Sequence, residues 1–309
     1  MSGLLFSLGS FVVGALPRAL VYRGASGLGS LAFTFRPALR RQAIENYAPV
    51  LRLPDGDPEV RRVARAAVIG YAQLIADFLL MPRLGRARLL DMIEPVGLDR
   101  LREVVDAGKG AIVVTPHFGN WDLAAAAAAA SGFKVTVVTE KFGPEGMNRK
   151  VVAARGRLGL KVVPLSIAAG KASVNALRRG EVVGLVCDLP KDGRNVAVNL
   201  VGQRAMVPAG PALLSLRSGA PVVPITCLRV ADGKYRLDVQ APLSRPREEA
   251  SEADVTAYAQ AIVDRFEAPL RAHPEQWYLF SPMWGRVGAA EEVSAGASPE
   301  PAVIGGGMR

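Results

Sequence analysis

The spacing of apolar residues changes near residue 110, and this change divides the predicted structure. From Arg36 to about Arg83, apolar residues recur three or four positions apart between arginines, as on one face of a helix. Pro54 interrupts the pattern. Asp57 and Pro58 then predict a new helix, because aspartate caps a helix start and proline fits its first turn. Two helices are therefore predicted before the first clear strand.

Beyond a short helix at residues 98–108, short continuous apolar runs predict strands that are buried on both faces. These predicted strands are residues 111–114, 135–139, 162–165, 182–187, 196–201, 222–228 and 235–239. Helical stretches at 122–130, 145–158 and 171–179 separate the first four strands. The alternation predicts an α/β fold with a mostly parallel central sheet flanked by helices. The later strands have one helix among them, which predicts an antiparallel part.

The end of the chain differs in composition. A last amphipathic helix at 252–271 precedes four aromatic residues, for which core packing is a better interpretation than a membrane interface: Trp277, Tyr278, Phe280 and Trp284. The residues after them are rich in Gly, Ala, Ser, Pro and Glu, which bury too little apolar area to order a segment. We therefore expect a helical, membrane-docking region at 1–96, an α/β domain at 97–285 and a disordered tail at 286–309.

The N-terminal run LLFSLGSFVVGAL, Leu4 to Leu16, is the longest apolar candidate for a membrane segment. It is shorter than the roughly 20 residues that a spanning helix needs. It also lacks the basic start and cleavage site of a signal peptide. Two interpretations stay open: the segment lies in the membrane interface, or it packs on the protein's own core.

Charge narrows the range of partners. The chain carries a net charge of +10, and residues 141–180 hold nine lysines and arginines against Glu145 alone. Such a surface attracts anionic lipid headgroups, a phosphorylated donor or an acidic carrier protein. Nucleic acid is disfavoured, because Phe142 is the one aromatic residue available for stacking in this stretch. A basic surface that is merely solvated remains the alternative.

The segment TPHFGNWDL, residues 115–123, carries the candidate chemistry. It places His117 directly after a buried strand, at the sheet edge where open α/β folds bind ligands. Asp122 falls near the start of the next helix, and a turn could bring it back onto one imidazole nitrogen. The other nitrogen would then accept a proton from a substrate hydroxyl. We expect the side chains of Asn120 and Trp121 to form the wall of the site and to orient this pair.

Other chemistries lack support in the sequence. No Gly-x-Ser-x-Gly elbow, dinucleotide fingerprint after the first strand or Gly-Lys-Ser/Thr phosphate loop occurs. His117 and His273 are far apart, which disfavours a zinc site. Cys187 and Cys227 sit singly in apolar runs, as in a reducing compartment. We expect direct group transfer without an acyl-enzyme, a cofactor or a metal.

The motif also carries a family resemblance. PHFGNWD, residues 116–122, resembles the H-x-x-x-x-D/E block of the lysophospholipid acyltransferase superfamily. Its Gly-Asn-Trp core resembles one branch, the bacterial lipid A late acyltransferases and the phosphatidylinositol mannoside acyltransferases. The segments at 97–122, VCDLPKDG at 186–193 and MVPAGPALLSLRSGAPVVP at 206–224 are similar to that branch in order and spacing.

The resemblance implies a peripheral or monotopic enzyme on the cytoplasmic face of the plasma membrane. It would transfer a fatty acyl chain from acyl-carrier protein or acyl-CoA to a hydroxyl of a glycolipid or phospholipid. His117 corresponds to the family's base and Asp122 to its carboxylate, while Arg149 and Arg155 would meet a phosphate. Asp188, at the end of a strand, is compatible with either a ligand for a substrate hydroxyl or a turn residue.

Two alternatives to this function remain open. One is a lysophosphatidic-acid or lysophospholipid acyltransferase that acts on ordinary glycerolipids. The other is a non-catalytic module that keeps the fold and binds a lipid or a carrier protein. Replacement of His117 by alanine separates the second alternative from an enzyme, because a binding module would keep its ligand and an enzyme would lose turnover.

Overall fold

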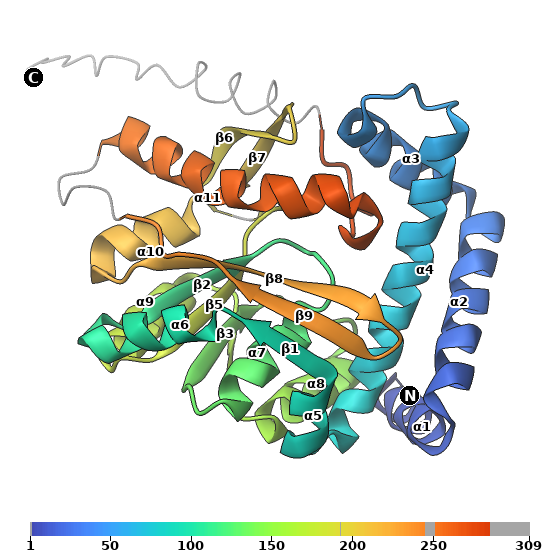
Figure 1. Ribbon diagram of the computed structural model, residues 1–309, viewed down its shortest axis with the longest axis horizontal. Coiled ribbons are helices and arrows are strands. Elements are labelled where there is room, and N and C mark those ends of the chain that lie inside the picture. Colours follow the sequence, from blue (N-terminus) through green and yellow to red (C-terminus); the bar gives the residue numbers. More distant parts are fainter. Residues whose placement is uncertain (1, 192, 245–250, 285–309) are drawn as a thin grey trace, which may run out of the picture.

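The computed structural model describes residues 2–191, 193–244 and 251–284, so the predicted tail at 286–309 lies outside the described residues. A seven-stranded sheet in the order β1-β9-β8-β2-β5-β3-β4 forms its centre (Figure 1). These strands are β1 (Ile93–Val96), β2 (Ala111–Thr115), β3 (Val135–Thr139), β4 (Leu160–Pro164), β5 (Val182–Val186), β8 (Val222–Ala231) and β9 (Lys234–Val239).

Five neighbouring strands, from β8 to β4 in this order, run parallel. β9 pairs antiparallel with β8 and parallel with β1. The predicted α/β class with a mostly parallel sheet is therefore confirmed, and so is the expected antiparallel part.

Helices cover both faces of the sheet. They are α5 (Arg86–Met92), α6 (Leu98–Val104), α7 (Trp121–Ala130), α8 (Glu145–Arg157), α9 (Ile167–Arg178), α10 (Gly210–Ser218) and α11 (Glu252–Ala272). Because side chains alternate along a strand, Ile112 and Val114 of β2 join the buried cluster with α9, α10 and α11. Ala111 and Val113 join the other cluster, with α7 and α8. Figure 1 shows α10 and α11 on one side of the sheet and α7 and α8 on the other.

Two strands were not expected from the sequence. β1 consists of only four residues at the sheet edge, where Pro95 is tolerated because no neighbour needs its missing N–H. β7 (Gln203–Pro208) pairs antiparallel with β6 (Asn195–Leu200) in a separate two-stranded sheet beside α11. The hairpin turns at Val201 and Gly202, which both have positive φ angles.

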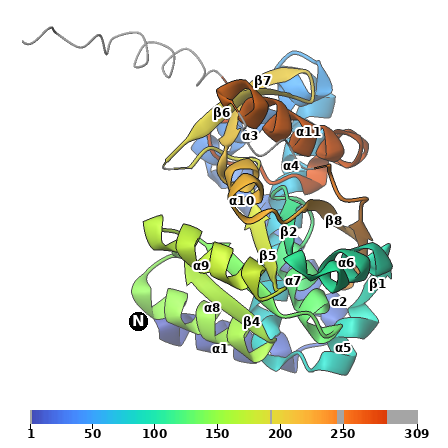
Figure 2. The same ribbon diagram turned by 90° about the vertical axis from the view of Figure 1, so that its left-hand side faces the viewer.

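The N-terminal region is helical, as predicted, with α1 (Ser2–Ala15), α2 (Arg18–Phe35), α3 (Pro37–Leu51) and α4 (Pro58–Leu80). Figure 1 shows α2 and α4 side by side along one flank of the sheet, and Figure 2 shows α1 beside α8. Among the described residues, one helix, Pro58–Arg83, is long and apolar enough to cross a bilayer by length and composition. Half of that apolar window is buried inside the fold.

α1 has two different faces. Phe6 and Ser10 are buried, whereas Leu4, Leu8 and Phe11 are 75%, 58% and 60% exposed. The helix therefore packs on the protein with one face and presents large apolar side chains with another. Packing of α1 on the protein's own core is therefore confirmed for one face, and docking of the exposed face on a membrane stays a prediction.

Candidate active site

The loop between β2 and α7 carries His117, and neighbouring segments fix its backbone. The Gly119 N–H donates to the Gln276 carbonyl at 2.9 Å, and the Asn120 N–H donates to the Cys227 carbonyl at 2.9 Å. Gly119 has a φ of 58°, and a Cβ there would lie 1.8 Å from the Cys227 carbonyl oxygen. Only glycine permits so close an approach. Gly119 therefore allows the loop of His117 to pack directly against the backbone at Cys227.

His117 pairs with Asp188, which follows β5. Its Nδ1 lies 2.6 Å from Asp188 Oδ1, and its backbone N–H donates to Oδ2 at 2.9 Å. β2 and β5 are adjacent and parallel, so their carboxyl ends bring the two residues together. Asp188 is fully buried, which by itself raises its pKa. The electrostatic interaction and hydrogen bonds with His117 outweigh this, and the pKa of Asp188 lies below its ordinary value.

The prediction that Asp122 folds back onto the His117 ring is wrong. Asp122 instead accepts hydrogen bonds from Nε and Nη2 of Arg155, at 2.7 and 3.1 Å. The cause is local: the Asn120 side chain caps α7, so the helix starts immediately and carries Asp122 in its first turn. From there the carboxylate reaches Arg155 on α8, and both side chains of this pair are at least nine-tenths buried.

The other predicted site residues take different places. The Trp121 ring lies edge-on to His117, with 5.2 Å between the ring centroids. Asn120 is 1% exposed and serves as the helix cap. Arg155 lines the cavity described below, whereas Arg149 is exposed on α8 and is not among the described residues that line it.

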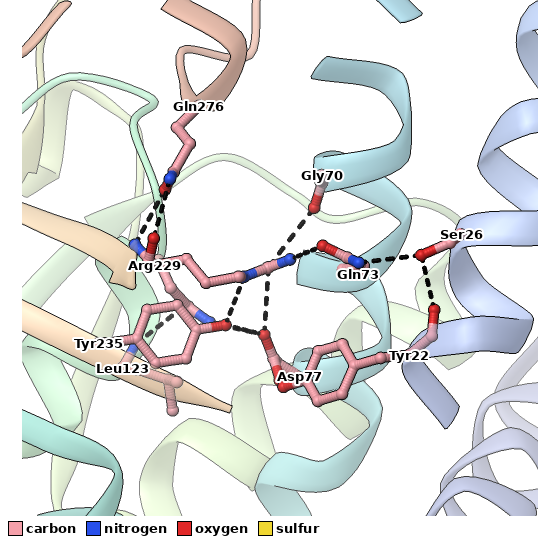
Figure 3. Close-up of polar contacts among 10 residues, drawn as sticks. Tyr22, Ser26, Gly70, Gln73, Asp77, Leu123, Arg229, Tyr235 and Gln276 are labelled. Carbon is pink, nitrogen blue, oxygen red and sulfur yellow. Dashed lines mark hydrogen bonds and ion pairs between the residues drawn. The ribbon is translucent and has the colours of Figure 1, made fainter. Parts of the chain in front are cut away.

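A buried polar cluster lies behind the loop, and sequence reasoning did not find it (Figure 3). Asp77 on α4 is 1% exposed and accepts hydrogen bonds from the hydroxyls of Tyr22 on α2 and Tyr235 on β9. Nη2 of Arg229 and Nδ2 of Asn120 each lie 3.4 Å from Asp77 Oδ2. Burial raises the pKa of Asp77, and Arg229 opposes that rise. The cluster joins α2 and α4 to the sheet and to the residue that caps α7.

An apolar cavity of about 590 Å³ opens beside His117. It runs along the strands, because its lining includes Val135 and Val182 at their starts as well as Thr139 at an end. α7 contributes three small residues to one wall: Ala124, Ala125 and Ala128. The alanine run in the sequence thus leaves space between this helix and the sheet. The size is within the range of small-molecule binding sites.

The cysteines do not supply a nucleophile. Both Cys187 and Cys227 are buried and free. Burial raises the pKa of Cys187 far above its ordinary value and that of Cys227 to about 12. Because the thiolate is the reactive form, neither side chain is activated at neutral pH. Within the described part of the chain, no group of three or more His, Cys, Asp and Glu side chains could hold a metal ion.

Comparison with known proteins identifies the family. A family model described as bacterial lipid A biosynthesis acyltransferase matches residues 4–286. The chain belongs to this acyltransferase family. As a member of the family, the protein is an O-acyltransferase. The match includes the loop of His117, the Asp188 segment and the N-terminal helices, so the whole described fold belongs to the family architecture.

Individual relatives agree with this membership. The chain is 30% identical over 288 residues to a phosphatidylinositol mannoside acyltransferase of Mycolicibacterium smegmatis (strain ATCC 700084 / mc(2)155), covering 92% of this chain and 91% of the relative. It is also 30% identical over 287 residues to a protein of the same name from Mycobacterium tuberculosis (strain CDC 1551 / Oshkosh), covering 90% of this chain and 87% of the relative.

Proposed function

We propose that this acyltransferase moves a fatty acyl chain from a thioester to a hydroxyl of a glycolipid built on a phospholipid. Acyl-carrier protein or coenzyme A would present the chain. One observation carries the proposal: Nδ1 of His117 is bound to the buried Asp188, while the same ring borders an apolar cavity. The names of the relatives support a phosphatidylinositol mannoside as the acceptor class.

In the proposed reaction, His117 acts as a general base. Asp188 keeps the ring proton on Nδ1, so the lone pair of Nε2 is available to the acceptor hydroxyl. As Nε2 takes the hydroxyl proton, the alcohol oxygen attacks the thioester carbonyl carbon. The carbon–sulfur bond then breaks, and the imidazolium returns the proton to the leaving sulfur. The products are an ester and a free thiol, and Asp188 stabilises the imidazolium between the two steps.

Arg155 supplies positive charge in the cavity wall. Nε and Nη2 of its guanidinium bind Asp122, which leaves Nη1 to donate to a carbonyl oxygen or a phosphate of the substrates. Asp122 then acts by holding this guanidinium in place, and not as the partner of the base. Arg149, exposed on the same helix, would meet a phosphate of the donor or acceptor at the surface.

The cavity is the proposed place of the acyl chain. Its apolar lining extends from His117 toward the starts of β3 and β5, so a chain whose carbonyl lies at the histidine would pass along α7. Burial of methylene groups there stabilises the bound donor by roughly 0.8 kcal/mol for each group.

The helical region of residues 1–96 is the proposed membrane-docking part, on the cytoplasmic face of the plasma membrane. Exposed leucines on α1 and α2 support this, among them Leu4, Leu8, Leu28 and Leu31, which are 75%, 58%, 68% and 54% exposed. Helices of this kind lie in the interface without crossing it. The net charge of +10 favours a surface with anionic lipids.

The test uses the purified full-length protein with acyl-CoA or acyl-carrier protein as donor. Phosphatidylinositol mannoside and lysophosphatidic acid, each in detergent, serve as alternative acceptors. Mass spectrometry of the lipids should show one added acyl group on the glycolipid. Acylation of lysophosphatidic acid alone would instead identify an enzyme of ordinary glycerolipids. No product from any pair, with lipid binding retained, would identify a binding module and contradict the proposal.

A further inference from the structure

Trp277 lies next to the active site although it is distant from it in sequence. It follows the short 3-10 helix Pro274–Gln276 and is fully buried. Its indole Nε1 donates a hydrogen bond to Asp188 Oδ2 at 2.7 Å. The sequence favoured aromatic core packing over a membrane interface for this residue, and the reaction proposed for His117 assigns it no role.

The contact restricts how the carboxylate of Asp188 can turn. Oδ2 accepts both the indole N–H and the backbone N–H of His117, whereas Oδ1 faces the imidazole Nδ1. An indole N–H can donate but cannot accept, so it binds only an acceptor oxygen. It therefore favours the ionised carboxylate, in keeping with its contribution to the lowered pKa of Asp188.

The backbone of Trp277 is held from two sides, and its indole packs against a second aromatic ring. The Tyr47 hydroxyl of α3 donates to the Trp277 carbonyl, and an isolated bridge pairs Trp277 with Phe118 in the active-site loop. The Trp284 ring packs edge-on against the Trp277 ring, with 6.2 Å between centroids. A donor fixed in this way can hold a carboxylate in one orientation. A mobile donor could not.

We propose that Trp277 is a positioning residue for acyl transfer, because its N–H fixes the Asp188 carboxylate in the orientation that binds Nδ1 of His117. In that orientation the opposite ring nitrogen, Nε2, is presented to the acceptor hydroxyl. The inference rests on the proposed role of His117 as the base. Trp277 acts through two other side chains and needs no contact with a substrate.

The alternative is that Trp277 only fills space in the core, and a matched control separates the two roles. Trp284 is half-buried beside it, and its Nε1 also donates, at 2.8 Å, but to the backbone carbonyl of Asn46. Trp277→Phe and Trp284→Phe therefore each remove one indole N–H and some ring volume from the same aromatic pair. Only the first removes a donor to Asp188.

A second variant removes the N–H without changing the volume. Site-specific replacement of Trp277 by benzothienylalanine puts a sulfur in place of the N–H and keeps the bicyclic shape. If Trp277→Phe fails to fold, this isostere still tests the proposal. Circular dichroism and thermal unfolding of each variant identify those whose fold is intact.

The measurements are kcat and KM for an acyl thioester donor and the proton NMR resonance of His117 Nδ1–H. His117→Gln identifies that resonance by its loss. We expect the isostere and Trp277→Phe to lower kcat by about 10- to 100-fold, the effect of a misplaced catalytic group, with KM nearly unchanged. The resonance should shift or broaden in both variants. Trp284→Phe should keep the resonance and stay within about threefold of the native kcat, because its hydrogen bond does not reach the carboxylate.

A folded isostere with native kcat and an unchanged resonance would reduce Trp277 to a packing residue and overturn the inference. A folded isostere with a raised KM and a native kcat would also overturn the inference. If His117→Gln retains native turnover, the proposed role of His117 fails as well. Loss of turnover in His117→Gln with full turnover in the isostere contradicts only the inference about Trp277.

Discussion

Asp122 binds the guanidinium of Arg155 through both of its oxygens, at 2.7 and 3.1 Å, inside the wall of the apolar cavity. The acid that follows the histidine in the sequence motif therefore pairs with a cation and not with the imidazole. One carboxylate, Asp188, binds the imidazole, and the other, Asp122, binds a cation beside the proposed acyl site. Each charge in this buried region has a partner, as a low-polarity environment requires.

Removal of the Asp122 charge should destabilise the protein strongly. Asp122→Asn leaves the buried Arg155 without its counter-charge, which costs roughly 3–5 kcal/mol for a pair of this burial. The control is Glu181→Gln, because Glu181 forms a similar two-bond pair with Arg179, whose side chain is half exposed. Loss of the Glu181 charge should lower the free energy of unfolding by less than about 1 kcal/mol. Urea denaturation measures the free energy of unfolding of both variants. An equal decrease in the two would show that the burial of the Asp122–Arg155 pair does not matter.

Ala128 should limit the length of the acyl chain. It lies in the cavity wall near the end of α7, so Ala128→Leu would fill space farther along the cavity than His117. We expect kcat/KM to fall about tenfold or more for long-chain donors and little for short ones, because a few buried methylene groups lose their place. Ala130→Leu on the same helix, outside the lining, is the control. Equal effects on all chain lengths would argue against this path for the chain.

Asp188 should contribute to stability in a pH-dependent way. Its folded-state pKa is depressed, so its contribution is fully present above the unfolded pKa of roughly 3.9 and is lost as the pH falls through the folded value. The native protein should therefore lose thermal stability more steeply below about pH 4 than Asp188→Asn does. Thermal unfolding between neutral and acidic pH tests this. Parallel pH curves for the two proteins would show that the carboxylate is not selectively stabilised.

Membrane docking should depend on the exposed leucines of α1. Leu4→Asp with Leu8→Asp should weaken binding to anionic vesicles at least tenfold, since each buried leucine contributes about 1.5–3 kcal/mol. Transfer to a detergent-solubilised acceptor should persist, because the cavity is unchanged. Ile167→Asp, at an exposed isoleucine of α9 outside residues 1–96, is the control and should bind normally. Undiminished sedimentation of the double variant with vesicles would contradict docking through this helix.

The periodicity of the sequence was sufficient to predict most of the α/β core, because buried parallel strands are continuous apolar runs. β1 was not predicted, because two of its four residues, Glu94 and Pro95, interrupt the apolar run. Only an edge strand tolerates them. The loop of His117 was predictable from its place after β2. The partner of the ring was not, because Asp188 reaches it through the pairing of β2 with β5.

The partners of Asp77 in its buried cluster could not be predicted from the sequence either. An aspartate inside an apolar helix has no visible partner in the sequence, since its partners Tyr22, Tyr235 and Arg229 come from three other elements. Local patterns report capping, periodicity and turn chemistry. They do not report which distant side chain will balance a buried charge, because that depends on strand order and on helix packing.

The most direct test of the central claim is a comparison of transfer rates for His117→Ala, Asp188→Asn and the double variant, with one thioester donor and the glycolipid acceptor. If Asp188 acts only through His117, each single variant loses several powers of ten in kcat, and the double variant is no slower than His117→Ala. A His117→Ala protein that folds normally and transfers acyl groups within tenfold of the native rate would contradict the account.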